Sequence, residues 1–405
     1  MLIHWIWLAT RNGIGSRGQA SLLRMFGTAE NIYSLTMEQC VTTEGFMKSW
    51  LEPVLDKDLS EADKILSSCD DFGVSVLTYA DPLYPKRLRN ISDPPTVLYY
   101  RGKLTNLDDE VPIAIIGTRQ CSTYGLLHAK QFSKLIANSG GIVVSGGARG
   151  IDTMAIKGGL DSSMPVICVI GTAIDNYYPK ENIWLFREVE RHGCVISEYP
   201  PGAKTYRSSF PQRNRIISGL SVGALVIEAP KGSGALITAS HALEQGRDVY
   251  TIPGNIGVKH YEGNLDLLRD GAMLVTNGWE VLENYVHLYP GKLADGRQKE
   301  NLEVIFASRY GLSLPIYSPA FTLPESDKKD VDIPPQTTYI KEKEPPKDLP
   351  EEENAIYKLL SDEPQHMDQI VAQSDMETSR VISALTMLQI KQLAEKQSGN
   401  YFVRK

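Results

Sequence analysis

The sequence predicts a doubly wound α/β fold of the Rossmann-like type, with a mostly parallel sheet, a small N-terminal helical domain and a C-terminal winged helix. Short apolar runs alternate with helical stretches in the middle of the chain, and both ends of the chain lack that alternation. A chain of 405 residues is also too long for one compact core. We therefore expect domains at residues 1–80, 81–296 and 351–405, with a linker at 297–350.

The first domain, residues 1–80, is expected to consist of short helices, because periodic apolar positions alternate with glycine breakers. The turn at 12–16 resembles that of a helix-hairpin-helix or SAM-like domain, which can offer backbone amides to phosphate. A helical packing module without a ligand is the interpretation we favour here. Residues 81–110 contain repeated prolines and are expected to form an extended connector.

The central domain is predicted from continuous apolar runs that end in glycine, proline or glutamate. Such runs, separated by helical segments, indicate parallel strands that are covered on both faces. The class is therefore α/β and doubly wound. The runs are Ile113–Gly117, Ile142–Gly146, Pro165–Gly171, Gly223–Glu228 and Asp248–Pro253.

The end of the chain combines a proline-rich stretch with a small helical domain. Residues 319–350 contain seven prolines among mixed charges, which predicts a flexible linker. Three helical stretches and a hairpin pattern then indicate a winged helix at 351–405. That segment holds nine acids and six bases, and its expected recognition helix, about 376–390, offers only Arg380. Because duplex readout needs more cations, we expect a protein-contacting or weakly DNA-contacting role.

Composition limits the functions that are open to the chain. The formal net charge is −7, so any binding of nucleic acid must depend on a local basic patch. The five cysteines show no C-x-x-C spacing, which fits reduced thiols and predicts no zinc site. No apolar run approaches the roughly 20 residues that span a bilayer, and the N-terminus lacks the features of a signal peptide. We expect a cytoplasmic protein without membrane contact, metal or cofactor.

The loops that follow the predicted strands carry the strongest functional signal. In an open parallel sheet these loops share the carboxyl edge, where ligands bind. Glycines let backbone amides approach an anion, helix N-termini add positive potential, and arginines bind phosphate directly. The sequence therefore predicts a site for polyphosphate or a nucleic-acid backbone. Its candidate residues are Gly117, Thr118, Arg119, Ser145, Gly146, Arg149, Gly150, Lys231, Gly232, Ser233 and Gly234.

Residues 204–215 (KTYRSSFPQRNR) contain four cations, no acid and one phenylalanine. Basic residues around an aromatic ring suit single-stranded DNA, in which a base stacks on the ring while phosphates meet the cations. The alternative is a solvated basic loop in which the phenylalanine anchors the core. We favour the nucleic-acid interpretation, which adds Lys204, Arg207, Phe210, Arg213, Asn214 and Arg215 to the site.

Ionisable residues elsewhere do not form a catalytic set, and we expect a binding protein rather than an enzyme. Asp152 follows Gly150-Ile151 at a helix start, where a carboxylate ordinarily serves as a cap. Glu228 ends a strand and could hold Arg213, Arg215 or a ribose. His128 and His241 lie within helical stretches and are expected to be packed or solvated. No Walker lysine motif, zinc spacing or nucleophile elbow is present.

Taken together, several segments resemble the DprA/Smf family, the DNA-processing protein A of bacteria. They are Ile116–Arg119 with Tyr124-Gly125, Ser145–Asp152, Ser197–Gly202, Phe210–Gly219, Gly232–Ala239, Ala242–Arg247 and Ile252–Gly254. The resemblance covers about residues 1–290, with a family-like winged helix at the end. It departs from the family pattern at Gly147, at Ala235 and over residues 255–264.

The resemblance implies a protein that binds incoming single-stranded DNA and loads the RecA recombinase onto it during natural transformation, usually as a homodimer. It also implies that Arg119, the loop Ser145–Gly150, and Phe210 with the following Arg213, Asn214 and Arg215 contact the strand. Two alternatives stay open. One is a nucleoside-phosphate hydrolase of the lysine-decarboxylase-like Rossmann group, although the glutamate of that motif is lacking near Gly234. The other is a nucleotide sensor coupled to a duplex-binding winged helix.

Overall fold

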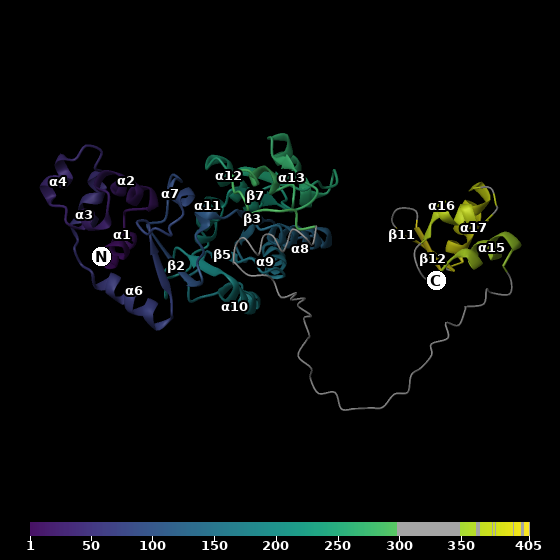
Figure 1. The fold of residues 1–405 in the computed structure, drawn as a ribbon, viewed down its shortest axis with the longest axis horizontal. Coiled ribbons are helices and arrows are strands. Elements are labelled where there is room, and N and C mark those ends of the chain that lie inside the picture. Colours follow the sequence, from purple (N-terminus) through teal and green to yellow (C-terminus); the bar gives the residue numbers. More distant parts are fainter. Residues whose placement is uncertain are drawn as a thin grey trace, which may run out of the picture. The chain divides into compact units, whose positions relative to one another are not determined.

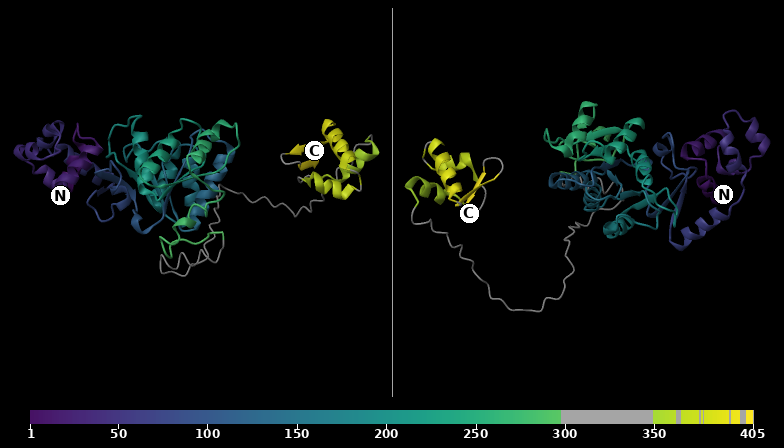
Figure 2. Two further views of the ribbon diagram at one scale, coloured as in Figure 1. Left: turned by 90° about the horizontal axis from the view of Figure 1, so that it is seen from above. Right: turned by 180° about the vertical axis from the view of Figure 1, so that it is seen from behind.

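The structure is a computed structural model, and it describes residues 1–297, 349–361, 365–374, 376, 378–391, 393–397 and 401–404. The chain divides into two compact units at residue 318, and Figures 1 and 2 show the fold of each. The predicted linker, residues 297–350, lies outside the described residues apart from its two ends.

The N-terminal segment is helical, as the glycine breakers and apolar periodicity predicted. Thr28 caps α3, Thr36 forms a capping box with Gln39 at the start of α4, and Gly27 ends α2 with a positive φ of 83°. The helices are α1 (Leu2–Thr10), α2 (Ser16–Phe26), α3 (Ala29–Tyr33), α4 (Met37–Thr42), α5 (Leu51–Leu55) and α6 (Ser60–Asp71), with a 3-10 turn η1 at Lys48–Trp50.

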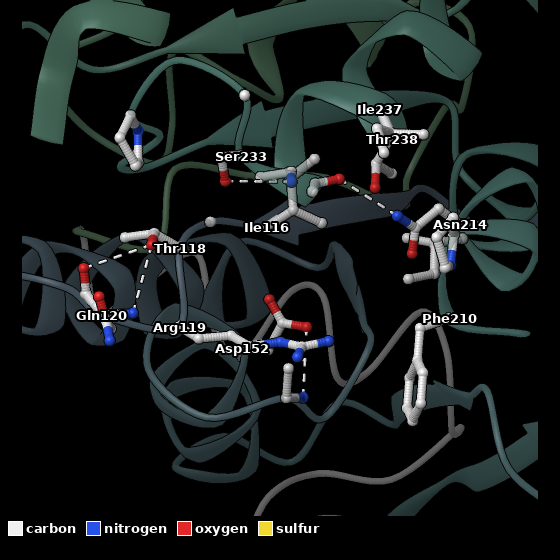
Figure 3. A pocket seen from close by; sticks show the side chains of 18 of the residues that line it. Ile116, Thr118, Arg119, Gln120, Asp152, Phe210, Asn214, Ser233, Ile237 and Thr238 are labelled. Atoms are coloured by element: carbon white, nitrogen blue, oxygen red, sulfur yellow. Dashed lines mark hydrogen bonds between the residues drawn. The ribbon is translucent and has the colours of Figure 1, made fainter. Parts of the chain in front are cut away.

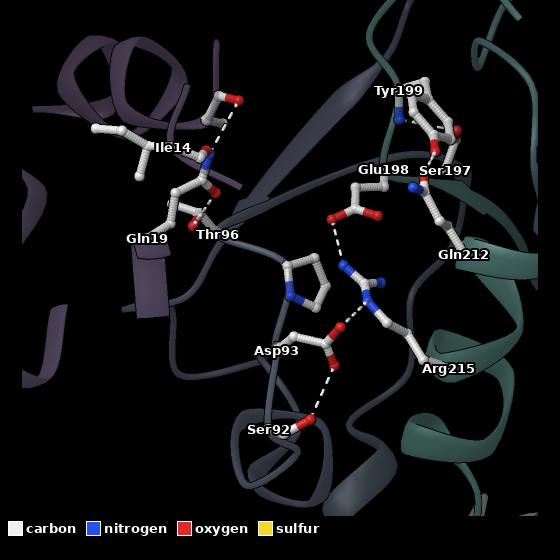
Figure 4. A network of polar contacts seen from close by, with 12 residues as sticks. Ile14, Gln19, Ser92, Asp93, Thr96, Ser197, Glu198, Tyr199, Gln212 and Arg215 are labelled. Carbon is white, nitrogen blue, oxygen red and sulfur yellow. Dashed lines mark hydrogen bonds and ion pairs between the residues drawn. The ribbon is translucent and has the colours of Figure 1, made fainter. Parts of the chain in front are cut away.

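The turn between α1 and α2 has an internal polar partner. The Gln19 side-chain amide donates to the carbonyls of Leu8 and Ile14, at 3.1 Å each. Its oxygen accepts a 2.8 Å hydrogen bond from the Thr96 hydroxyl, on the segment that leads into the sheet. These bonds are shown in part in Figure 4. They give the turn a packing role, and a phosphate-binding role for it stays untested.

A nine-stranded sheet forms the centre of the first unit, in the order β1-β2-β6-β5-β4-β3-β7-β8-β9. Strands β3 to β9 are mutually parallel, and β3 to β7 are buried along their whole length. This confirms the predicted Rossmann-like, mostly parallel sheet. The strands are β1 (Ser75–Thr78), β2 (Val97–Gly102), β3 (Pro112–Ile116), β4 (Ile142–Ser145), β5 (Val166–Ile170), β6 (Cys194–Ser197), β7 (Gly223–Val226), β8 (Asp248–Thr251) and β9 (Met273–Leu274).

The proline-rich segment 81–110 was expected to be only a connector, and this was incomplete. It contains β2, which pairs antiparallel with β6 on one side and with β1 on the other. The prolines precede the strand, so they remove no hydrogen bond from its ladder. The first unit therefore has two antiparallel strands at one edge of its parallel sheet.

Helices cover both faces of the sheet. Figure 1 shows α8, α9 and α10 on one side of the strands, and α11, α12 and α13 on the other. The strand order reverses between β3 and β7, so the loops after these strands diverge to opposite faces. The helices are α7 (Lys86–Arg89), α8 (Thr123–Asn138), α9 (Ile151–Leu160), α10 (Ile183–His192), α11 (Ser209–Leu220), α12 (Gly234–Glu244) and α13 (Glu262–Arg269), with 3-10 turns η2 (Leu107–Asp109), η3 (Lys180–Asn182), η4 (Lys259–Tyr261) and η5 (Glu283–Tyr285).

The second unit has the predicted winged-helix arrangement of helices and a small antiparallel sheet in the order β10-β12-β11. Its core is separate and includes Ile356, Leu385 and Phe402. The short strand β10 was not predicted. The elements are α15 (Glu351–Leu359), β10 (Gln365–His366), α16 (Met367–Ser374), α17 (Thr378–Ile390), β11 (Ala394–Gln397) and β12 (Tyr401–Arg404).

Within the part of the chain that the structure describes, no helix is long and apolar enough to cross a membrane. The same described residues include no group of three His, Cys, Asp or Glu side chains that could hold a metal ion. The five cysteines are free thiols.

Candidate functional site

A cavity of about 550 Å³ opens at the carboxyl edge of the sheet, where the strand order reverses between β3 and β7. It is lined by the loop after β3, the start of α9, the first half of α11 and the loop into α12, as Figure 3 shows. Many of the residues that line it were predicted from the sequence to be site residues. The predicted site residues that line it are Gly117, Thr118, Arg119, Phe210, Arg213, Asn214, Lys231, Gly232, Ser233 and Gly234.

Close packing between two loops requires glycine at the floor of this cavity. A Cβ atom on Gly117 would lie 2.5 Å from the Ile151 side chain, and one on Gly150 would lie 2.5 Å from the Thr118 carbonyl oxygen. Gly150 also has a positive φ of 77°, which a side chain would strain. Gly117 and Gly150, which were predicted to contact an anion, therefore also allow the loops after β3 and β4 to pack closely together.

The loop into α12 is open to a ligand. Gly232 has a positive φ of 73°, and a Cβ atom on Gly232 or Gly234 would meet nothing within 4 Å. Ser233 caps the helix by accepting the amide of Ala235 at 3.3 Å. The positive end of the α12 dipole therefore lies at the cavity, together with the exposed ammonium of Lys231, which pairs with Asp266 at 3.4 Å.

Arg119 and Phe210 form the part of the site that best fits a base and a phosphate. The Arg119 side chain is exposed, and its guanidinium carbon lies 5.6 Å from the centre of the Phe210 ring. The ring itself is half-buried and lines the cavity. A Cβ atom on Gly171 would lie 3.1 Å from Phe210, so that glycine makes room for the ring. Phe210 thus serves as a packed residue on one side and an accessible surface on the other.

Arg213 lines the cavity, but its guanidinium already donates hydrogen bonds to protein carbonyls. Its guanidinium donates to the backbone carbonyls of Gly146, at 2.7 Å, and Val169. Its Nε donates to the Asn214 side chain at 3.2 Å, and the Asn214 amide donates to the Gly234 carbonyl at 3.2 Å. Burial lowers the pKa of Arg213. This pair of residues ties α11 to the loops after β4 and before α12.

Asp152 was expected to cap α9, and the structure corrects this. Gly150 is the N-cap residue, whereas Asp152 lies in the first turn with its carboxylate 3.4 Å from the Ala148 amide. Burial raises the pKa of Asp152 to about 6, against the opposing charge of Arg213. Among the described residues that line the cavity, Asp152 is the only acid, and it points toward the cavity in Figure 3.

Arg215 was predicted to contact DNA, and the structure places it elsewhere. It is 5% exposed and forms ion pairs with Asp93 at 3.2 Å and Glu198 at 2.6 Å, as Figure 4 shows. Burial alone would lower the pKa of Arg215, but the two carboxylates raise it overall. Because segment 209–220 is a helix and not a loop, residues two apart point about 200° away from each other. Arg213 and Arg215 therefore face different surroundings.

Other predicted contacts also fall outside the cavity. Ser145 is fully buried, and its hydroxyl donates to the Ile115 carbonyl at 2.7 Å inside the sheet. Lys204 and Arg207 are exposed in the loop before α11, and neither lines the cavity. Gly146 and Arg149 line a smaller adjoining cavity instead, where the exposed Arg149 pairs with Glu181.

Glu228 was suggested as a partner for Arg213, Arg215 or a ribose, and it has other partners. Its buried carboxylate accepts hydrogen bonds from the Ser122 amide at 2.9 Å, the Ser122 hydroxyl at 2.6 Å and the Tyr261 hydroxyl at 2.9 Å. The His260 Nδ1 atom lies 3.0 Å away. Glu228 thus fastens the divergent loop 255–264 to the loop after β3.

Tyr178 and Pro179, which line the smaller cavity, were missed by the sequence analysis. They follow β5 by eight and nine residues, outside the short glycine loop at the end of that strand, and the exposed aromatic ring after a buried strand is the sequence feature that marks them. The His128 ring packs against Tyr124 with 4.0 Å between ring centres and the planes tilted by 59°, and burial lowers the pKa of His128. His241 lies 3.6 Å from Glu244 on the same helix, so both histidines occupy packed or surface positions on their helices.

Comparisons with known proteins agree with this architecture. Residues 75–286 match the family described as DNA recombination-mediator protein A, and residues 341–400 match the DprA winged helix domain. The chain belongs to the DNA recombination-mediator protein A family. It is 32% identical to the Protein Smf of Synechocystis over 410 residues, which covers 99% of this chain and 98% of that protein.

Further members of the family are similar over shorter stretches. The DNA processing protein DprA of Bacillus subtilis is 34% identical over 265 residues, covering 65% of this chain and 89% of that protein. The X-ray structure of DNA processing protein A from Streptococcus pneumoniae matches with a TM-score of 0.60 and 32% identity. That match covers 70% of this chain and 97% of the other.

Proposed function

We propose that this protein binds single-stranded DNA in the cavity between the loops after β3 and β7, without chemistry on the strand. The observation that carries this proposal is the pairing of Arg119 with the accessible Phe210 ring, beside the open glycine loop and the N-terminus of α12. Cations that track a backbone, next to aromatic rings that stack on bases, are the features of single-strand grooves.

The concave shape of the site favours a single strand over a duplex. A base can reach the Phe210 ring only if its face is free, and the bases of a duplex are already stacked and paired. The cavity, about 550 Å³, has room for a nucleotide-sized group. Phosphates on either side of such a base would meet Arg119 and the amides of the loop into α12.

Membership of a family of recombination mediators supports the finer part of the proposal. We infer that the protein delivers the bound strand to the RecA recombinase during natural transformation, and that it acts as a homodimer in the cytoplasm, where RecA works. The measurement is the rate at which RecA forms filaments on single-stranded DNA covered by a single-strand-binding protein. This protein should raise that rate, and an unchanged rate would remove the loading function while leaving strand binding intact.

A hydrolase acting on a nucleotide is the competing function. It would need a carboxylate or histidine placed to activate water, and Asp152 is the only such group among the described residues that line the cavity. Asp152 is 6% exposed and faces the Arg213 guanidinium in the interior. This placement favours a role in shaping the charge of the site. Release of base or phosphate from a mononucleotide would instead support the hydrolase.

The proposal is tested by fluorescence anisotropy with labelled oligo-dT, duplex of equal length and a labelled mononucleotide. We expect tightest binding to oligo-dT, with a strong dependence on salt. Arg119→Ala should lower the slope of log K against log salt by about 0.7, the value for one single-strand phosphate. Arg191→Ala, an exposed arginine in the last turn of α10, is the matched control and should leave binding unchanged. Equal affinity for duplex would overturn the proposal.

A further inference from the structure

Two large aromatic side chains lie exposed close together in the sequence: Tyr178 on the segment that joins β5 to α10, and Trp184 in the first turn of α10. Tyr178 is 45% exposed and Trp184 is 52% exposed, whereas Trp5, Trp7 and Trp50 are each at most 7% exposed. Exposing rings of this size to water forgoes the stabilisation that burial would give. Tyr178 lines the smaller cavity beside the proposed site, and Trp184 follows it by six residues, which suggests a ligand that covers both rings.

Tyr178 continues the aromatic surface that begins at Phe210. The two ring centres are 5.8 Å apart, with the planes tilted by 58°. Both residues line the smaller cavity together with Arg119 and Arg149. Because Arg119 and Phe210 also line the larger cavity, the two cavities adjoin at these side chains. A strand that leaves the larger cavity past Phe210 meets Tyr178 next.

The segment 178–184 is fastened to the neighbouring loop, so its rings are held in place before any ligand binds. The Asn182 side chain donates to the Gly147 carbonyl at 3.1 Å and to the Thr153 hydroxyl at 2.7 Å. Glu181 pairs with Arg149 at the same loop. A surface that is already ordered loses little conformational entropy on binding.

Trp184 carries a cation beside its ring. The Lys157 ammonium, from α9, lies 5.2 Å from the ring centre. Among the described residues, no acid forms an ion pair with Lys157. Lys157 beside the exposed Trp184 ring therefore resembles Arg119 beside the Phe210 ring, with a cation next to an accessible aromatic surface in both pairs. Bases could stack on the ring while a phosphate meets the ammonium.

We propose that Tyr178 and Trp184 form a second base-stacking surface, which takes the nucleotides that follow the one held at Phe210. This inference rests on the proposed function of the cavity. The occupant is single-stranded DNA, because Tyr178 lines a cavity that adjoins the proposed site and the charge beside Trp184, at Lys157, is positive. A protein partner covering the same rings is the alternative that the experiment must separate.

The experiment uses the full chain and the intrinsic fluorescence of Trp184, the most exposed of the tryptophans that the structure describes. Titration with oligo-dT of about 20 nucleotides, longer than typical site sizes of roughly 4–16 nucleotides, should quench tryptophan emission. A mononucleotide, which reaches only the larger cavity, should not. Trp184→Phe should abolish the quenching, because it removes the reporter while keeping a ring.

Affinity is measured separately by anisotropy of labelled oligo-dT. Tyr178→Ala and Trp184→Ala should each bind roughly 5- to 100-fold more weakly, as expected for one lost base stack. Tyr178→Phe should lose less, because it keeps the ring. Leu243→Ala, which removes a 53% exposed apolar side chain from the last turn of α12, is the matched control and should bind like the wild type.

The outcomes distinguish this inference from the proposed function. If wild-type protein binds oligo-dT by anisotropy but shows no quenching, and the alanine variants keep full affinity, the second surface is wrong and the cavity assignment stands. Full affinity of the alanine variants would then assign the rings to a protein partner. If wild-type protein fails to bind oligo-dT at all, both the proposed function and the second surface are overturned.

Discussion

The two sides of α11 place arginines of one short segment in different environments. On the side facing the cavity, Arg213 is held by backbone carbonyls of the loop after β4 and of β5 itself. The Arg119 guanidinium, from the loop after β3, approaches the Phe210 ring there from the solvent. On the other side, Arg215 is enclosed by Asp93 and Glu198 and lines neither of the two cavities described above. The comparison shows that a cluster of cations in sequence is not a cluster of available charge in space.

Availability follows from the backbone that carries each cation. Arg119 lies in the loop that begins where β3 ends, at the edge of the sheet, and its side chain is exposed to solvent. A helix packed on a sheet turns some of its positions inward, and an inward arginine is stable only with partners. We therefore expect variants of Arg215 to change stability, and variants of the rim to change binding.

The largest expected effect belongs to Arg215→Ala. Removing the guanidinium leaves the partly buried Asp93 and Glu198 unpaired, which typically costs about 3–5 kcal/mol. The free energy of unfolding from urea denaturation should fall by about that amount. Under conditions in which the variant is folded, its affinity for oligo-dT and the slope of log K against log salt should match those of the wild type.

Arg187→Ala is the control for Arg215, because Arg187 is half-exposed and pairs with Glu190 across one turn of α10. Its loss should change the free energy of unfolding by less than about 1 kcal/mol. A stable Arg215→Ala variant with a salt slope reduced by about 0.7 would instead restore Arg215 as a phosphate contact.

Asp152 gives the next largest effect, through pH. Burial raises its pKa to about 6, above the unfolded value of about 3.9. Between these values the folded state holds a proton that the unfolded state has released, so the free energy of unfolding falls as pH rises through about 4 to 6. Asp152→Asn has no titrating carboxyl at this position, so its free energy of unfolding does not show this fall. The stability of the variant relative to wild type should therefore grow by about 3 kcal/mol from pH 4 to 7.

Urea denaturation at several pH values measures this difference, with the exposed Asp270→Asn as control. The same titration bears on the cavity, because an ionised Asp152 disfavours a nearby phosphate. Asp152→Asn should therefore bind oligo-dT more tightly than wild type at pH 8, and the two should converge below pH 6. A pH-independent difference in both measurements would show that Asp152 is ionised throughout the range.

Much of the fold was predictable because burial on both faces leaves a continuous apolar signal. The runs that became β3, β4, β5, β7 and β8 have this character. Strand β2 was hidden by the prolines before it, and the two-residue β9 is too short to leave a pattern. Strand β6, four residues long, follows α10 after a single glycine, so no clear break in the sequence separates it from the helix.

The site was predictable where glycine and arginine lie on loops, and was not where partners come from distant segments. The cavity includes Arg119 and residues 231–234, as the position of parallel strand ends requires. The partners of Arg215 and Glu228 come from positions such as Asp93 and Tyr261, whose proximity depends on tertiary packing. Assigning 209–220 to a helix would have separated Arg213 from Arg215.

Phe210→Ala tests the side of α11 that faces the cavity. Loss of one base stack should weaken binding by about 1–3 kcal/mol and leave the salt slope nearly unchanged, because no phosphate contact is removed. The exposed Phe72→Ala is the matched control. A circular-dichroism melt comes first, since Phe210 also packs near Gly171. An early melt would assign the ring to the core, and unchanged affinity of a stable variant would show that no base stacks on it.

The smallest effect is expected from removing residues 319–405, the whole second unit. The cations of this unit that the structure shows in ion pairs include Arg380, with Glu352 at 3.4 Å, and Lys391, with Glu353 at 2.7 Å. Cations that are already paired with carboxylates, on a segment with a net negative charge, contribute little to phosphate binding. The shortened chain retains the core of the first unit and both cavities.

Its affinity for oligo-dT should stay within about threefold of the full chain, less than one typical contact to DNA, with an equal salt slope. Anisotropy measures both quantities on the two chains at the same salt concentrations. A large loss of affinity, or a slope reduced by several times 0.7, would move the main DNA contact to the winged helix. Such a result would also reverse the comparison, because the engaged cations of the second unit would then have to exchange their carboxylate partners for phosphates.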